Sequence, residues 1–264
     1  MRPGKFSGAV AQLVEHLLCK QRVAVSSTAR STIDITMDIL TVHYNNPLLL
    51  EGLVRSVRKY TDCTIHVFDN SDEEPFTKQM DNVDIIDNTK GQIFNFKELL
   101  EQYPDKKPGL FAKYGSAMHT YSVDACFDIL TDGFILMDSD VLVKKDFTWI
   151  WDENYVWSGE MKNDGPKGVY VMRLLPFLCY INVPMCKKHG VRYFNGEWMW
   201  NLTTKKPNTF YDTGAWFMKD TLDKRLPHKD FIVSDYVEHF SHGSHEMLNI
   251  DFYDWLIEHK NLWL

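Results

Sequence analysis

Residues 134–143 read FILMDSDVLV, and this stretch gives the clearest sign of the fold. Its first four residues are all apolar, as expected of a strand that is buried on both faces of a sheet. An acidic pair, Asp138 and Asp140, follows directly, before the chain becomes apolar again. Ligands of parallel α/β sheets bind at the carboxyl ends of the strands, so the sequence predicts that this pair faces a binding site.

The residues before this stretch alternate between strand and helix patterns. Runs rich in β-branched and aromatic residues predict strands, and apolar residues at helical spacing predict helices. In chain order, the predicted elements are a strand at 38–44, a helix at 47–60, strands at 64–68 and 83–86, a helix at 116–129 and the strand at 134–137. This order predicts an α/β fold with a mostly parallel sheet covered by helices on both faces.

Residues 148–264 are rich in Trp, Tyr, Pro and short polar turns, and their periodicity is weaker. They contain no internal repeat, no low-complexity tract and no Gly/Ser linker that would mark a separate domain. We therefore expect this half to pack on the same sheet and to build the rest of a cleft. Residues 37–264 are predicted to form a single domain.

Residues 1–36 differ from the rest of the chain. They carry five basic and two acidic residues, and apolar residues between Val10 and Leu18 fall on one face of a short helix. Such a leader is similar to an organelle transit peptide, but residues 8–30 also resemble the product of reading through a transfer-RNA gene. We favour the second interpretation, in which translation starts at Met37 and residues 1–36 are a non-native or disordered extension.

The composition limits the classes of function. The chain of 264 residues has 29 basic and 36 acidic side chains, which gives a formal net charge of −7 and excludes a basic nucleic-acid clamp. No stretch approaches the roughly 18 consecutive apolar residues of a membrane span, so we expect at most peripheral membrane contact. The five Cys are scattered without a C-x-x-C pair, and we interpret them as free thiols in a reducing compartment.

Asp138 and Asp140 have the spacing of a metal-binding pair. Two carboxylates two residues apart at a strand end can share one hard divalent cation, which prefers oxygen ligands and leaves positions open for phosphate oxygens. The cation also reverses the charge of the site, because bare aspartates repel an anionic nucleotide diphosphate. The alternative is a solvated acidic turn, since an isolated D-x-D motif is common.

Two further polar segments give the acidic pair a context: residues 41–46, TVHYNN, and residues 67–72, VFDNSD. Together with the D-x-D motif, they resemble the nucleotide-binding half of GT-A glycosyltransferases of the family-2 type, over about residues 38–147. The resemblance implies a Rossmann-like three-layer α/β/α sandwich, with a nucleotide-binding half at 37–147 and an acceptor-binding half at 148–264. It also implies that the cofactor is Mg²⁺ or Mn²⁺.

The same resemblance assigns roles to residues at the strand ends. Tyr44 is expected to contact the base of the nucleotide, and Asp69 to accept hydrogen bonds from the base or the ribose. Asp138 would reach the ribose and the metal, and Asp140 would bind the metal that holds the diphosphate. Asp69 has an alternative interpretation as the cap of a turn, because Asp and Asn favour such turns.

Asp212, in the run YDTG at 211–214, is the candidate catalytic base. A sugar hydroxyl needs a carboxylate that takes its proton as the new bond forms. Inverting GT-A enzymes place such an acid after the D-x-D region, and Glu197 is the second candidate. An Asp-Thr-Gly run is equally typical of a helix cap or a tight turn, so both interpretations of Asp212 stay open.

A histidine-rich segment at 237–245, VEHFSHGSH, supplies a candidate third metal ligand. Its H-x-x-x-G-S pattern resembles that of rhamnosyltransferase-like GT-A members, and neutral imidazole is a competent ligand beside carboxylates. We favour His239, with His242 second; the alternative is a polar loop whose histidines face solvent. Ser116 and His119 begin the helix before the D-x-D strand and are expected to face the donor, although a helix cap explains Ser116 equally well.

These resemblances predict a glycosyltransferase that moves a sugar from a nucleotide-diphosphate sugar to a hydroxyl of a saccharide or lipid-linked saccharide, with inversion. The usual setting of the resembled family implies bacterial surface polysaccharide or lipopolysaccharide synthesis, in the cytoplasm or at the inner face of the membrane. A sugar-phosphate nucleotidyltransferase is the nearest alternative, but such enzymes resemble one another in a Gly-rich loop after the first strand, and residues 43–47, HYNNP, contain no Gly. A non-catalytic carbohydrate-binding or scaffold protein is the alternative from another class.

Overall fold

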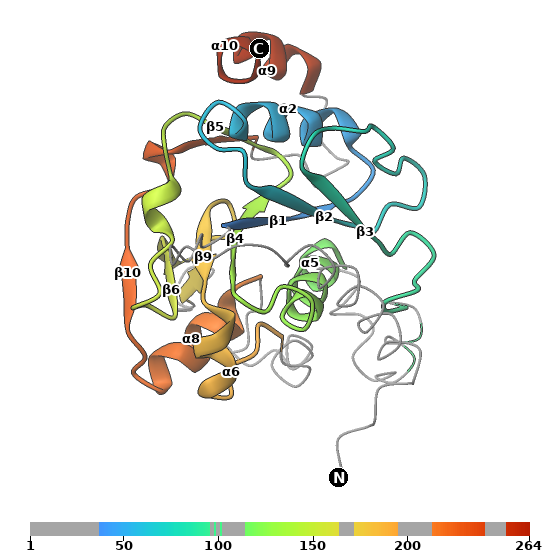
Figure 1. Ribbon diagram of the computed structural model, residues 1–264. Helices are drawn as coiled ribbons and strands as arrows, with labels where there is room; N and C mark the ends of the chain where they lie inside the picture. The colour runs from blue at the N-terminus through green and yellow to red at the C-terminus, as the bar shows by residue number, and fades with distance from the viewer. Residues whose placement is uncertain are drawn as a thin grey trace, which may run out of the picture. The chain divides into compact units, whose positions relative to one another are not determined.

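The computed structural model describes residues 37–95, 98, 101, 114–163, 172–194, 213–240 and 252–264. They belong to one compact unit that spans Met37–Leu264. Its centre is a seven-stranded sheet in the order β10-β6-β9-β4-β1-β2-β3 (Figure 1). Its strands are β1 (Asp38–His43), β2 (Thr64–Asp69), β3 (Val83–Asp87), β4 (Phe134–Asp138), β6 (Trp157–Gly159), β9 (Cys179–Ile181) and β10 (His228–Asp230).

The first half of the chain forms the parallel part of this sheet. β1 lies between β2 and β4 and runs parallel to both, and β2 pairs in parallel with β3. In this register, Val42 lies beside Asp138 of β4, and His43 lies beside Asp69 of β2. The carboxyl ends of β1, β2 and β4 therefore meet at one edge of the sheet.

Strand residues alternate between two buried clusters, one on each face of the sheet. On β1, Ile39 packs in a cluster with α2 (Pro47–Val57), and Leu40 packs in a cluster with α5 (Tyr114–Cys126). Figure 1 shows these two helices on opposite sides of the strands. Burial on both faces explains why β4 begins with four consecutive apolar residues. The predicted α/β class, with a mostly parallel sheet between two helical layers, is confirmed.

The helix α2 follows β1 because its first residues suit a helix start. Pro47 has the fixed φ of a first helical residue and lacks an N–H that would need a partner. The side chain of Asn46 accepts a hydrogen bond from the Leu49 N–H at 3.4 Å. The helix ends at Val57, before the predicted end at residue 60, because residues 58–60 form a turn. Its fully buried apolar side chains are Leu50, Leu53, Val54 and Val57.

The helix α5 covers the opposite face of the sheet. Val123, Cys126 and Phe127 are fully buried there. The helix ends at Cys126 rather than at the predicted residue 129, because the chain continues as a turn in which amides bond to carbonyls three residues earlier. The helices α6 (Val183–Lys188) and α8 (Ala215–Asp223) contribute to the same buried cluster.

The second half of the chain adds strands to the same sheet. β9 runs antiparallel to both β4 and β6, and β10 runs parallel to β6. Two short antiparallel ribbons lie outside this sheet. One pairs β5 (Val141–Val143) with β11 (Val237–His239), and the other pairs β7 (Met161–Asn163) with β8 (Met172–Leu174).

The last described residues form the helices α9 (Phe252–Glu258) and α10 (Lys260–Trp263). Leu256 of α9 is buried against Leu49 of α2 and Leu142 of β5 in a small third cluster. The remaining short elements are the 3₁₀ turns η2 (Thr148–Ile150) and η4 (Val233–Asp235). Among the described residues, no helix has the length and apolar character needed to cross a lipid bilayer.

Candidate functional site

The acidic pair lies at the carboxyl end of β4. Asp138 is the last residue of this strand, and Asp140 follows in the turn that leads into β5. Both side chains are partly buried, with 19% and 13% of their surfaces exposed. Since Asp138 is also in register with the end of β1, the pair faces the same edge as the polar segment after β1.

His239 reaches this pair through the ribbon of β5 and β11. In the register of the two strands, His239 lies opposite Val141, and the N–H of Phe240 donates to the main-chain oxygen of Asp140 at 2.9 Å. The His239 Nε2 atom lies 3.4 Å from Asp140 Oδ1. Its ring stacks on Phe177, with 3.7 Å between the ring centroids, which fixes the plane of the imidazole.

Asp138, Asp140 and His239 form a possible metal site. One ligand atom from each residue can be chosen so that all three lie within 4.8 Å of one another. Ligand atoms that bind one ion at about 2.1 Å lie at most about 4.2 Å apart, so only a small closure is needed to hold Mg²⁺ or Mn²⁺. Two carboxylates and one imidazole suit such an ion and leave coordination positions for phosphate oxygens.

The three side chains also affect one another electrostatically. Burial acts to raise the pKa of Asp138, but the neighbouring His119, His239 and Arg173 outweigh it, and this pKa lies below its ordinary value. Burial raises the pKa of Asp140 against the effect of His239, and the Asp138 charge adds to this rise. Burial acts to lower the pKa of His239, but both carboxylates raise it above its ordinary value. A cation placed among these groups would relieve the repulsion between the carboxylates.

Tyr44 lies at the same edge, directly after β1, and is half exposed. Its hydroxyl donates to Asp72 Oδ2 at 3.2 Å, and the Asn45 side-chain amide donates to Asp72 Oδ1 at 2.6 Å. Asn45 Oδ1 in turn accepts from the N–H groups of Glu73 and Glu74 at 3.0 Å. The segments after β1 and β2 are thus tied together, and the ring of Tyr44 stays accessible to a ligand.

Asn45 is a residue of this site to which the sequence reasoning gave no role. Its φ of 48° lies in the left-handed region, which Asn tolerates better than most residues. The signal was present in the sequence, since an Asn pair before Pro47 is typical of a tight turn.

Asp69 is buried under this loop, with 1% of its surface exposed. Its Oδ1 accepts from the Ser71 N–H at 2.9 Å, and its Oδ2 accepts from the Phe76 N–H at 2.8 Å. These are the bonds that the interpretation as a turn cap predicts. Each oxygen keeps a second lone pair, so the predicted contact with the base or ribose stays a prediction.

His119 extends from α5 to the acidic pair. Its Nε2 lies 3.1 Å from Asp138 Oδ1, and its Nδ1 lies 2.9 Å from the Thr213 hydroxyl. The sequence predicts that His119 faces the donor, but it gives no sign of the contact with Thr213, which is far away in the chain. Arg173 of β8 is a second residue that the sequence reasoning missed, and its positive charge acts on the pKa of both Asp138 and His239.

The predicted base Asp212 and the second candidates Glu197 and His242 lie outside the described residues. Thr213 and Gly214 are the next described residues, and they directly precede α8. Gly214 has a φ of 77°, and a Cβ at this position would lie 2.2 Å from the main-chain oxygen of Leu174. Only glycine allows α8 to approach β8 this closely.

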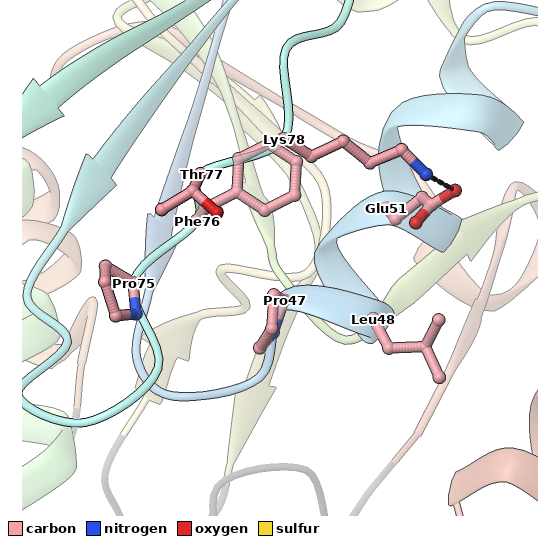
Figure 2. Close-up of a pocket in the computed structure, with 7 residues that line it drawn as sticks. All are labelled: Pro47, Leu48, Glu51, Pro75, Phe76, Thr77 and Lys78. Atoms are coloured by element: carbon pink, nitrogen blue, oxygen red, sulfur yellow. Dashed lines mark hydrogen bonds and ion pairs between the residues drawn. The ribbon is translucent and has the colours of Figure 1, made fainter.

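A separate pocket of about 270 Å³ lies beside the start of α2 (Figure 2). Figure 2 shows the ion pair between Lys78 and Glu51 at one side of it and the ring of Phe76 at another. The other lining residues are Pro47, Leu48, Pro75 and Thr77. The pocket contains none of the residues that the sequence predicts for the site.

No family model and no curated protein sequence matches this chain. Among solved structures, it is similar to the glycosyltransferase GlyE of Streptococcus pneumoniae TIGR4, with 12% identity and a TM-score of 0.41, over 86% of this chain and 50% of that chain. It is also similar to the mannosyltransferase PcManGT of Pyrobaculum calidifontis, solved in complex with GDP-Man and Mn²⁺. The identity is 11% and the TM-score 0.40, over 96% of this chain and 68% of that chain. The PaToxG glycosyltransferase has 14% identity and a TM-score of 0.38, over 97% of this chain and 89% of that chain. This chain spans half the length of GlyE, and likenesses at these scores assign no activity to it.

Proposed function

We propose that the protein is a metal-dependent glycosyltransferase that uses a nucleotide-diphosphate sugar as donor. The observation that carries this proposal is the convergence of Asp138, Asp140 and His239 at the carboxyl edge of the parallel sheet. Ligands of open α/β sheets bind at this edge. The resemblance of the segments around Tyr44 and Asp69 to the GT-A pattern supports the same function.

The chemistry of the proposed site follows from its charges. Bare carboxylates repel a diphosphate, so the donor needs a cation held by Asp138, Asp140 and His239. Bound there, Mg²⁺ or Mn²⁺ supplies Lewis-acid stabilisation of the departing nucleotide. The protein's own part is to hold the two carboxylates and the imidazole in place through the turn after β4 and the ribbon of β5 and β11.

The nucleotide is proposed to bind at the ends of β1 and β2. The half-exposed ring of Tyr44 offers an apolar face to the base. The carboxylate of Asp69 would contact the base or the ribose while it holds the loop beneath them through Ser71 and Phe76. Asp138 would reach the ribose from β4.

Asp212 is the proposed catalytic base, which deprotonates the acceptor hydroxyl and gives inversion at the sugar carbon. The proposed acceptor is a saccharide or lipid-linked saccharide in bacterial surface polysaccharide or lipopolysaccharide synthesis. The proposed location is the cytoplasm or the inner face of the membrane. Two points support this role. Asp212 comes after the D-x-D region in the chain, and the residue next to it, Thr213, bonds to His119 beside Asp138.

Calorimetry with nucleoside diphosphates, with and without Mn²⁺, tests the proposal. We expect binding only with Mn²⁺, a loss of about 100-fold or more in Asp140→Ala, and no change in Asp132→Ala. Asp132 is a matched control because it is an exposed aspartate just before the opposite end of β4. Metal-independent binding, or no binding by the wild type, would reject the enzyme in favour of a carbohydrate-binding or scaffold protein.

A turnover assay with a panel of nucleotide-sugars separates binding from chemistry. Asp212→Asn is expected to bind donor and Mn²⁺ normally but to lose transfer, because the amide cannot accept the proton. If this variant transfers sugar at the wild-type rate, Asp212 is not the base, and the metal site remains to be judged by the calorimetry.

A further inference from the structure

One imidazole joins two parts of the chain that are far apart in sequence. His119 lies on α5, between Asp138 at the end of β4 and Thr213 before α8. Its side chain is largely buried, with 14% of its surface exposed. Nε2 has no well-aligned hydrogen bond among the described groups, and Asp138 Oδ1 lies beside it at 3.1 Å.

We propose that His119 is a positioning residue for the candidate metal site. In this arrangement, Nε2 carries a proton and Nδ1 faces the Thr213 hydroxyl. The ring directs the Nε2–H at one oxygen of Asp138 and leaves the other oxygen for the cation. The part of this proposal that concerns the cation rests on the proposed function, but the direction in which the Nε2–H points does not.

The groups around the ring favour a proton on Nε2. A lone pair on Nε2 would face the negative charge of Asp138, whereas an N–H there is attracted to it. Nδ1 then faces the Thr213 hydroxyl, 2.9 Å away, which can either donate to it or accept from it. The Tyr193 hydroxyl lies 3.4 Å from the Thr213 oxygen on the other side, so the polar chain continues into the core.

This arrangement connects the carboxylate of Asp138 to the turn before α8. Gly214, directly after Thr213, packs against the main chain of Leu174, so the turn has little room to shift. A rigid turn holds the Thr213 hydroxyl, and the hydroxyl limits rotation of the imidazole. Groups of this kind, which orient metal ligands without touching the metal, typically change metal affinity about 10–100-fold when they are lost.

The contacts of the two ring nitrogens can be tested one at a time by substitution. In His119→Gln, the longer side chain places an N–H₂ near the position of Nε2 and keeps a donor beside Asp138. In His119→Asn, the shorter side chain places its oxygen near the position of Nδ1 and keeps the bond to Thr213 only. Thr213→Val removes the hydroxyl at nearly constant volume, and Thr213→Ser restores it.

The first experiment is ¹⁵N NMR of the metal-free protein, with the His119 signals assigned by their loss in His119→Gln. We expect the nitrogen shift of an Nε2 atom that carries a proton. A ring protonated on Nδ1 alone would overturn the proposal. This result does not depend on whether the protein is a glycosyltransferase.

The second experiment measures Mn²⁺ affinity by electron paramagnetic resonance, with thermal unfolding as the control for folding. We expect His119→Gln to stay within about threefold of the wild type, and His119→Asn to lose about tenfold or more. Thr213→Val should lose affinity and Thr213→Ser should regain it. Equal losses in the Gln and Asn variants, or unchanged affinity in the Asn or Val variant, would overturn the proposal. If the wild type itself binds no Mn²⁺, the proposed function fails and the NMR result still decides the state of His119.

Discussion

The two halves of the molecule build the candidate site in different ways. The first half supplies Asp138 and Asp140 from positions two residues apart, at the end of a buried parallel strand and in the turn after it. The second half supplies His239 from a three-residue strand that is held beside Asp140 by pairing with β5. The first arrangement depends on local sequence, whereas the second depends on contacts between distant segments. Substitution of His239 should therefore change metal binding while the parallel sheet keeps its fold.

The largest effect on stability is expected at the contact between α8 and β8. Gly214→Ala should lower the free energy of unfolding by about 4 kcal/mol, because the methyl group meets a main-chain oxygen and the φ is left-handed. Gly190 is a matched control, since its φ is 61° but a Cβ there meets nothing within 4 Å. Gly190→Ala should cost about 1 kcal/mol, from backbone strain alone. Urea unfolding of both variants measures the difference, and equal losses would show that the close approach to β8 is not rigid.

A smaller change is expected when the second half loses its metal ligand. His239→Ala should weaken Mn²⁺ binding about 10–100-fold, equal to about 1.4–2.7 kcal/mol, while the two carboxylates still attract the ion. His189→Ala, at an exposed position after α6, should bind Mn²⁺ like the wild type. The comparison is made by titration with Mn²⁺. Unchanged affinity in the His239 variant would mean that the first half alone forms the site.

The smallest effects are expected at two helix caps, one in each half. Asn182 caps α6 with a bond of 2.9 Å to the Met185 N–H, and its amide also donates to the Glu153 oxygen at 3.1 Å. Asn46 caps α2 through one longer bond, to Leu49. Replacement by Ala should cost about 2 kcal/mol at Asn182 and about 1 kcal/mol at Asn46. Thermal unfolding should preserve this order; the reverse order would contradict the view that α2 is held mainly by its apolar face.

The sequence predicted the parallel part of the fold well, for a physical reason. Strands buried on both faces need continuous apolar runs such as 134–137, and the polar segments at their ends are equally visible. Helix ends were placed less accurately, because the turns after Val57 and Cys126 keep helix-like bonds without continuing the helix. The strands β6, β9 and β10 have three residues each, which is too short for a periodic pattern.

The candidate site could be predicted only in part. The acidic pair was visible because both residues lie in one short motif, and His239 because its segment resembles a known pattern. The contact of His119 with Thr213 and the charge of Arg173 near Asp138 arise from tertiary packing that no local pattern records. The turn-cap bonds of Asp69 were weighed as an alternative, since Asp at a strand end serves both purposes.

The central claim is that Asp138, Asp140 and His239 gather a divalent cation and, through it, a diphosphate. The most direct measurement is anomalous diffraction from a crystal soaked with Mn²⁺ and a nucleoside diphosphate. We expect a manganese peak within coordination distance of these three side chains, with diphosphate oxygens as further ligands. A manganese ion and diphosphate bound elsewhere, with these three side chains free of metal, would contradict it.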